Sequence, residues 1–240
     1  MKKILILTLT GILCLSLTSC IDFLEEITIN EDGSGSYYIE MNMEKAMDKL
    51  AAMMPEDKQA EMREKGFLKE DDKAELDSLA QVVREQYGVE SFEYKTEGLS
   101  VQFSFDFENI NQAYQTMNTV FGNSEEDGSS KLGGMGGSYM SMEQKGKKVL
   151  FSRYAPAKEP KVSEEGDEDG ESEKMEAMLM NFLEGGTYES VIKFPSKVKV
   201  SGNKYASLSD DKKTVTIRAS LTDLMENNNI GDFNAKYKIK

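Results

Sequence analysis

The chain has 240 residues, of which 43 are acidic and 29 basic, so that its formal net charge is −14; it contains no histidine and no tryptophan. A charge this negative repels the phosphate backbone, which argues against a nucleic-acid partner. Histidine is the side chain most used as a general base and metal ligand near neutral pH. Its absence favours a protein that is not an enzyme, although carboxylate or serine–lysine chemistry stays open.

The N-terminal residues are typical of a secretory signal peptide. Lys2 and Lys3 precede an apolar run over residues 4–17, and a basic end followed by a short apolar stretch is the pattern of such peptides. The run is shorter than the roughly 20 residues that an apolar helix needs to cross a bilayer. We therefore expect residues 1–19 to be removed from the mature protein.

The apolar run ends at a cysteine. Its last residues, Leu17-Thr18-Ser19-Cys20, resemble the lipobox of bacterial lipoproteins, in which the cysteine thiol is acylated and the chain is cut just before it. This resemblance implies attachment to a membrane through acylated Cys20, because two or more acyl chains hold a protein firmly at a bilayer. The alternative is an ordinary signal peptide followed by a chance cysteine.

Acidic residues follow the cysteine at once, and we expect a lipidated tether over residues 20–26. Asp22, Glu25 and Glu26 resemble the acidic surface-export signals of Bacteroidetes lipoproteins. Ile21 stands where some proteobacterial lipoproteins carry the aspartate that retains them at the inner membrane. These resemblances favour a lipid anchor in the outer membrane of the cell envelope, and they leave open whether the protein faces the periplasm or the cell surface.

Residues 27–240 are predicted to form a single α+β domain. In the first half, apolar residues with a period of two predict strands, and those spaced by three or four predict helices. An Asp-Gly pair between two such strands indicates a hairpin. The expected elements are a hairpin over residues 27–41, helices over 43–54, 56–65 and 71–87, strands over 89–95 and 99–107, and a helix over 110–121.

The second half alternates between ordered and loose segments. Stretches rich in glycine, serine and acidic residues predict flexible loops at about residues 122–138 and 155–173. Periodic apolar residues predict a hairpin over 139–154, a short helix over 174–183, and strands over 188–194, 197–201, 214–220 and 233–239. The whole pattern predicts an α+β fold, an antiparallel sheet with helices packed on one face and two flexible loops.

Two stretches carry a further family resemblance. The segments INEDGSGSYYIEMNMEKAMDKL and YESVIKFPSKVKVSGNKYASLSDDKKTVTIRASLTDL combine a strand–turn–strand, a helical link and a late Phe-Pro-x-x-Val strand. This pattern resembles the LppM-type envelope lipoproteins and uncharacterised Bacteroidetes relatives. The resemblance implies a β-rich lipoprotein domain with a groove for envelope lipid. We expect a non-enzymatic envelope protein that binds an apolar ligand or a protein partner.

The acidic run in the second loop raises an alternative function. An EF-hand loop binds Ca²⁺ through oxygen ligands at positions 1, 3, 5, 9 and 12, with glycine at position 6. Gly170 fits position 6, whereas position 8, which should be apolar, is Ser172. The candidate ligands are Glu165, Asp167, Asp169, Glu173 and Glu176. Because no helix is predicted before this run, we prefer a solvated linker without a cofactor and keep a calcium-dependent surface or adhesion module as the alternative.

No set of catalytic residues is predicted. The spacing Ser-x-x-Lys marks some serine nucleophiles, and it occurs four times, including Ser190 with Lys193. Four occurrences in a chain rich in both residue types indicate chance.

Overall fold

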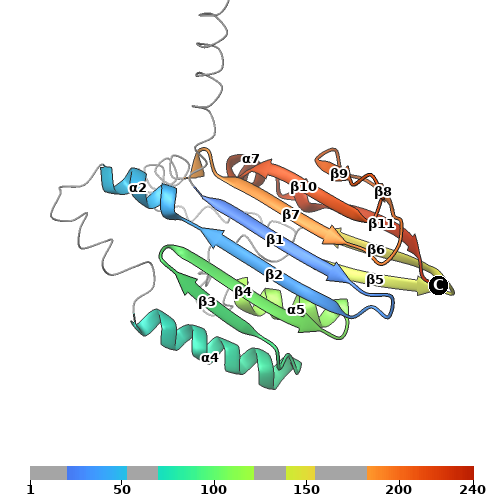
Figure 1. Cartoon of the computed structure of the whole chain (residues 1–240), viewed down its shortest axis with the longest axis horizontal. Helices are drawn as coiled ribbons and strands as arrows, with labels where there is room; N and C mark the ends of the chain where they lie inside the picture. The colour runs from blue at the N-terminus through green and yellow to red at the C-terminus, as the bar shows by residue number, and fades with distance from the viewer. Residues whose placement is uncertain (1–20, 53–69, 122–138, 155–182) are drawn as a thin grey trace, which may run out of the picture.

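The computed structural model describes residues 21–52, 70–121, 139–154 and 183–240. Within these residues the chain forms two β-sheets and four α-helices (Figure 1). The strand pairs are antiparallel except for the pair of β1 with β7. The predicted α+β class is confirmed, with the strands divided between two sheets.

Several expected elements lie outside the described residues. They are the helix over 56–65, the loops over 122–138 and 155–173, and nearly all of the helix over 174–183. In the part of the chain that the structure covers, no helix has both the length and the apolar composition needed to cross a membrane.

The larger sheet has seven strands in the order β3-β4-β2-β1-β7-β10-β9. β1 is its middle strand and pairs with β2 on one side and with β7 on the other. Asp22 in β1 and Thr187 in β7 are neighbours although 165 residues separate them, so both ends of the chain are needed to complete this sheet. Its strands are β1 Asp22–Ile29, β2 Gly35–Asn42, β3 Glu93–Glu97, β4 Ser100–Phe107, β7 Thr187–Lys193, β9 Ala206–Leu208 and β10 Thr214–Ser220.

The smaller sheet has four strands in the order β5-β6-β11-β8. In Figure 1 β5 and β6 emerge from behind β1 and β7. The ring of Phe151 in β6 packs edge-on against that of Phe194 just after β7, with centroids 5.6 Å apart, so the two sheets meet face to face as in a sandwich. The strands are β5 Tyr139–Lys145, β6 Lys148–Tyr154, β8 Lys199–Ser201 and β11 Phe233–Lys238.

Helices cover the remaining part of the larger sheet's inner face. α4, Glu70–Tyr87, and α5, Ile110–Phe121, pack against each other and against β3 and β4. Phe103 of β4 lies edge-on against Phe121 of α5, with ring centroids 5.5 Å apart. The shorter helices are α2 Glu44–Ala52, α7 Leu221–Glu226 and the 3-10 turn η1 Asn228–Gly231. The inner face is therefore shared between a helical layer and the smaller sheet.

The N-terminal strand begins earlier than expected. The predicted tether over residues 20–26 is wrong from Asp22 onward, because β1 starts there. Every second side chain from Phe23 onward is buried, which is the alternation of a strand with one face in the core. Ile21 is also buried, and its carbonyl accepts a hydrogen bond of 2.7 Å from the backbone N–H of Thr187. The folded body therefore begins directly after the predicted acylation site.

The turn between β1 and β2 explains two glycines. Gly33 has a φ of +89°, in the left-handed region that glycine adopts without steric cost. Gly35 has an ordinary backbone, but a Cβ there would overlap both the carbonyl of Thr28 and the ring of Phe107. The close approach of β1, β2 and β4 at this end of the sheet therefore requires glycine.

Candidate functional site

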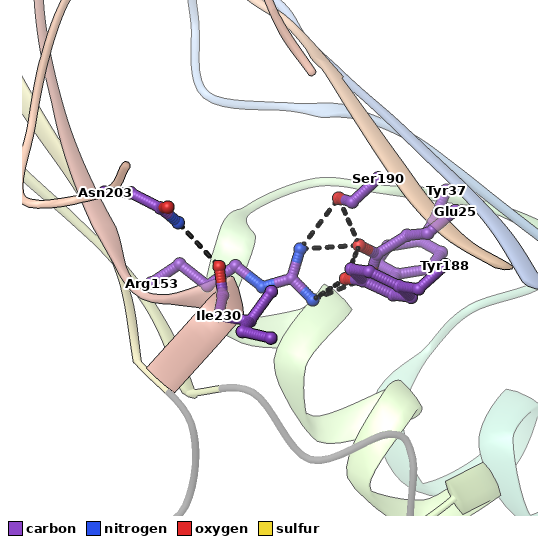
Figure 2. A network of polar contacts seen from close by, with 7 residues as sticks. All are labelled: Glu25, Tyr37, Arg153, Tyr188, Ser190, Asn203 and Ile230. Carbon is purple, nitrogen blue, oxygen red and sulfur yellow. Dashed lines mark hydrogen bonds and ion pairs between the residues drawn. The ribbon is translucent and has the colours of Figure 1, made fainter. Parts of the chain in front are cut away.

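A cluster of polar side chains is buried where the two sheets meet (Figure 2). It consists of Glu25, Tyr37, Arg153, Tyr188 and Ser190, and we call it the buried polar cluster. Arg153 projects from β6 of the smaller sheet, whereas the other four project from β1, β2 and β7 of the larger sheet. Each lies among the buried side chains of its own strand. The alternation that builds the core therefore also brings these five side chains together.

Glu25 and Arg153 form a two-pronged ion pair at the centre of the cluster. Arg153 Nη1 lies 2.5 Å from Glu25 Oε2, and Arg153 Nη2 lies 3.2 Å from Glu25 Oε1. The side chain of Arg153 is only 6% exposed, and that of Glu25 only 3%. Two charge-assisted hydrogen bonds fix the orientation of the two groups as well as their separation, so this pair joins β1 of one sheet to β6 of the other.

The three hydroxyl groups complete the hydrogen bonding of the ion pair. Tyr37 donates to Glu25 Oε1, while Ser190 and Tyr188 donate to Oε2 at 2.5 and 3.2 Å. Arg153 in turn donates from Nη1 to Ser190 Oγ at 2.9 Å and from Nη2 to the Tyr188 hydroxyl at 3.1 Å. The buried carboxylate thus accepts hydrogen bonds from four side chains, which offsets part of the cost of removing a charge from water.

Two opposing effects set the charge states of the ion pair. Burial raises the pKa of the Glu25 carboxyl, but the charge of Arg153 and the hydrogen bonds that Glu25 accepts outweigh burial and lower this pKa below its ordinary value. Burial likewise lowers the pKa of Arg153, and the adjacent carboxylate overrides that effect, so that the pKa rises. Both residues are therefore charged at neutral pH.

The tyrosines of the cluster remain protonated for the same reasons. Burial first, and the Glu25 carboxylate second, raise the pKa of Tyr37 well above its ordinary value of 10.0. Burial is also the largest cause that raises the pKa of Tyr188 to about 12. Both hydroxyl groups therefore act as hydrogen-bond donors to the carboxylate.

The cluster is arranged to hold charges rather than to transfer a proton. A general base works best with a pKa near the operating pH, whereas the pKa of Glu25 is lowered. Lys193 follows Ser190 by three residues and therefore points to the opposite face of β7, where it is exposed and lies 2.7 Å from Glu26. The Ser-x-x-Lys spacing at this place does not form a nucleophile–base pair. The geometry favours a structural tie between the sheets.

A second polar contact in Figure 2 lies near the cluster and has a structural role. Asn203 Nδ2 donates a hydrogen bond of 2.6 Å to the carbonyl of Ile230, and its Oδ1 accepts one of 2.7 Å from the backbone N–H of Tyr205. The contact joins the segment between β8 and β9 to η1. It satisfies a backbone carbonyl of the fully buried Ile230, which would otherwise be costly to leave without a donor.

The site residues predicted from the sequence lie outside the described residues. They are the acylation site Cys20 and the candidate calcium ligands Glu165, Asp167, Asp169, Glu173 and Glu176. Acylation and calcium binding therefore stay predictions. Among the residues that the structure places, no three His, Cys, Asp or Glu side chains are grouped so that they could hold a metal ion.

The buried polar cluster is not predicted from the sequence, although the sequence contains one signal of it. The stretch from Ile21 to Ile29 alternates in hydrophobicity, and Glu25 interrupts it at an inward position. A charged residue at such a position is buried only when it is paired. Arg153 and Ser190 interrupt the apolar alternation of β6 and β7 in the same way, but a local pattern does not reveal that the three meet.

Comparisons with known proteins give a distant likeness. No protein-family model matches this chain, and no curated protein matches it. Among solved structures, the chain is similar to the NMR structure of the folded domain of LppM from Mycobacterium tuberculosis, with 14% identity and a TM-score of 0.45 over 93% of this chain and 92% of that one.

Proposed function

We propose that this protein is a lipid-anchored, non-enzymatic component of the bacterial cell envelope that acts by binding a protein partner or an apolar ligand. The observation that carries the proposal is the sequence Leu17-Thr18-Ser19-Cys20 after a basic and apolar leader. All four positions of the tetrapeptide agree with a lipobox. An outer-membrane location is the finer proposal, supported by the acidic residues that follow the cysteine.

The start of the fold is compatible with such an anchor. Ile21 is buried and hydrogen-bonded to the backbone of Thr187, so the chain enters the core immediately after Cys20. An acyl group on that residue would hold the folded body close to the bilayer surface. The anchored end of the body would be the end at which β1 and β7 begin.

The buried polar cluster is not assigned a catalytic role in this proposal. It is the most strongly perturbed set of titratable groups in the described residues, and such sets are the usual first candidates for catalytic machinery. Here both charged groups are paired with each other, and the carboxylate accepts hydrogen bonds from four side chains. We therefore assign the cluster a structural role.

The anchor is tested with two matched cysteine variants in cells fed a labelled fatty acid. Cys20→Ser removes the predicted acyl acceptor, so the label should be absent from the protein, and the chain should leave the membrane fraction or keep its leader. Cys14→Ser lies within the predicted leader and should behave like wild type. Equal labelling and fractionation of Cys20→Ser and wild type would show that the proposal is wrong.

A further inference from the structure

Five lysines gather on the outward face of the smaller sheet. β5, β6, β8 and β11 together carry five exposed lysines, Lys145, Lys148, Lys199, Lys236 and Lys238, and one acidic residue, Glu143. Arg153 of β6 points inward to Glu25. The exposed charges of these strands therefore sum to +4 in a chain whose formal net charge is −14. We call this surface the basic face.

The strand register places these lysines next to one another. Lys148 lies directly opposite Lys145 on one side and Lys238 on the other, and Lys236 lies directly opposite Lys199. Residues at directly opposed positions have Cβ atoms roughly 5 Å apart, and like charges there destabilise the sheet. Three lysine–lysine pairs on one small sheet therefore oppose folding, which makes a chance arrangement a poor explanation.

The outward-facing cations of the larger sheet, in contrast, form ion pairs with acidic residues. Lys95 is paired with Glu97, and Lys193 with Glu26, at 2.9 and 2.7 Å. Arg218 lies 2.8 Å from Glu189. In contrast, none of the five lysines of the basic face forms an ion pair with a residue that the structure describes. The basic face is thus the outward sheet surface whose positive charge is left without compensation.

Exposed aromatic rings lie at the other end of the basic face. Tyr139 and Tyr154 are directly opposed across β5 and β6 and are 47% and 41% exposed. They are on the same side of the sheet as Lys148, because residues two apart in a strand share a face. Tyrosine is enriched at protein–protein interfaces, where its ring contributes apolar contact and its hydroxyl stays hydrogen-bonded.

We propose that the basic face docks an acidic segment of a partner protein, with the carboxylates over the lysines and an apolar side chain against the tyrosines. This inference names the chemistry of the partner in the binding function proposed above and rests on that function. The opposite charge of the two surfaces supplies the orientation of docking.

The position of the lysines argues against the anchoring membrane as the occupant. Lys147, in the turn next to Lys148, accepts a backbone hydrogen bond of 3.0 Å from Ile239, and Lys240 lies 3.9 Å from Glu31 in the turn after β1. The lysine end of the basic face therefore lies by the C terminus, at the end toward which β1 points in Figure 1. This end of the basic face is about 25 Å, the length of one eight-residue strand, from the start of β1, where the proposed anchor would hold the protein at the membrane.

The excess negative charge of the chain restricts where an acidic partner can dock. At 0.1 M salt the Debye length is about 10 Å, so a segment at contact responds chiefly to the charges beneath it. Over the basic face these charges are positive, whereas the outward face of the larger sheet carries more acids than bases. Docking should therefore be confined to the basic face.

The test uses the full chain in a nonionic detergent at 0.1 M salt. Its probe is a fluorescein-labelled peptide of eight glutamates followed by Phe-Leu, with binding followed by fluorescence anisotropy. Lys148→Glu with Lys236→Glu should weaken binding at least tenfold. The control, Lys95→Glu with Lys193→Glu, changes the net charge equally on the larger sheet and should weaken binding less than twofold. Tyr154→Ala should weaken binding of this peptide more than binding of the same peptide ending in Ser-Ser.

Three results would overturn the proposal. They are no binding by wild type, equal losses in the two double variants, and binding of polygalacturonate or of mixed micelles of the detergent with phosphatidylglycerol at least as tight as the peptide at equal charge concentration. The last result would assign the face to an anionic glycan or lipid surface instead of a protein. None of these measurements depends on acylation of Cys20, so their failure is distinguishable from failure of the anchor.

Discussion

Glu25 Oε2 and Arg153 Nη1 meet at 2.5 Å although the two residues are 128 positions apart in the chain. Both side chains point inward, Glu25 from β1 and Arg153 from β6, and these strands belong to different sheets. A buried ion pair is little more stabilising than a pair of apolar residues in its place, because the cost of removing both charges from water offsets their attraction. Its role here is to fix how the two sheets are placed on each other.

Removing one partner of this pair should be far more costly than removing both. Arg153→Met leaves the Glu25 carboxylate buried without its cation and should lower the free energy of unfolding by about 3–5 kcal/mol. Glu25→Leu combined with Arg153→Met should recover most of that loss. Guanidinium chloride unfolding of the two variants and wild type measures both effects. If the free energy of unfolding of Arg153→Met lay within about 1 kcal/mol of that of wild type, this role would be contradicted.

The lowered pKa of Glu25 predicts how the free energy of unfolding depends on pH. A depressed carboxyl pKa gives stability that is fully present above the unfolded pKa of about 4.3 and is lost as the pH falls through the lower folded value. The difference in unfolding free energy between wild type and Glu25→Gln should therefore stay constant from pH 7 to pH 5 and shrink only below about pH 4. Urea unfolding at each pH measures it, and a difference that already closes between pH 7 and pH 5 would refute the assigned charge state.

Gly35→Ala should destabilise the fold by steric overlap. Its Cβ would collide with the Thr28 carbonyl and the Phe107 ring, and the expected loss is about 3 kcal/mol. Gly146→Ala is the matched control, because nothing lies near its Cβ and only its φ of +60° is unfavourable, at about 1–2 kcal/mol. Thermal unfolding should therefore rank Gly35→Ala below Gly146→Ala, and the reverse order would be incompatible with the close approach.

The acidic run over residues 165–176 should not select calcium. A solvated linker predicts small and equal changes of melting temperature in millimolar Ca²⁺ and Mg²⁺, because both ions only screen charge. A site would instead raise the melting temperature with Ca²⁺ by mass action. Asp167→Asn with Asp169→Asn is the control. A calcium-selective shift that this double variant abolishes would establish the calcium-dependent alternative.

Local patterns predicted most of the described elements. The strand over residues 99–107 and the helix over 110–121 appear as β4 Ser100–Phe107 and α5 Ile110–Phe121, because the periodicity of each is set by one buried face. The hairpin predicted over residues 139–154 appears as β5 and β6. Gly146 in its turn adopts the left-handed conformation that the turn requires. Elements whose structure depends on residues close together in the chain can therefore be predicted from the sequence.

Pairings between distant segments were not predictable in this way. The parallel pairing of β1 with β7 and the division into two sheets depend on contacts between the two ends of the chain. The acidic residues Asp22, Glu25 and Glu26 favour a solvated tether when the sequence is considered alone. The burial of Glu25 is explained by partners far from it in the chain, chiefly Arg153. The basic face is likewise a product of strand register, since its lysines come from four separate strands.

Attachment of the protein through acylated Cys20 is tested most directly by mass spectrometry of the wild-type protein extracted from membranes. We predict a mature chain that begins at Cys20 and carries the added mass of acyl groups on the peptide that contains Cys20 and Ile21. A mature chain that begins elsewhere, or a Cys20 peptide of unmodified mass, would contradict the lipid anchor.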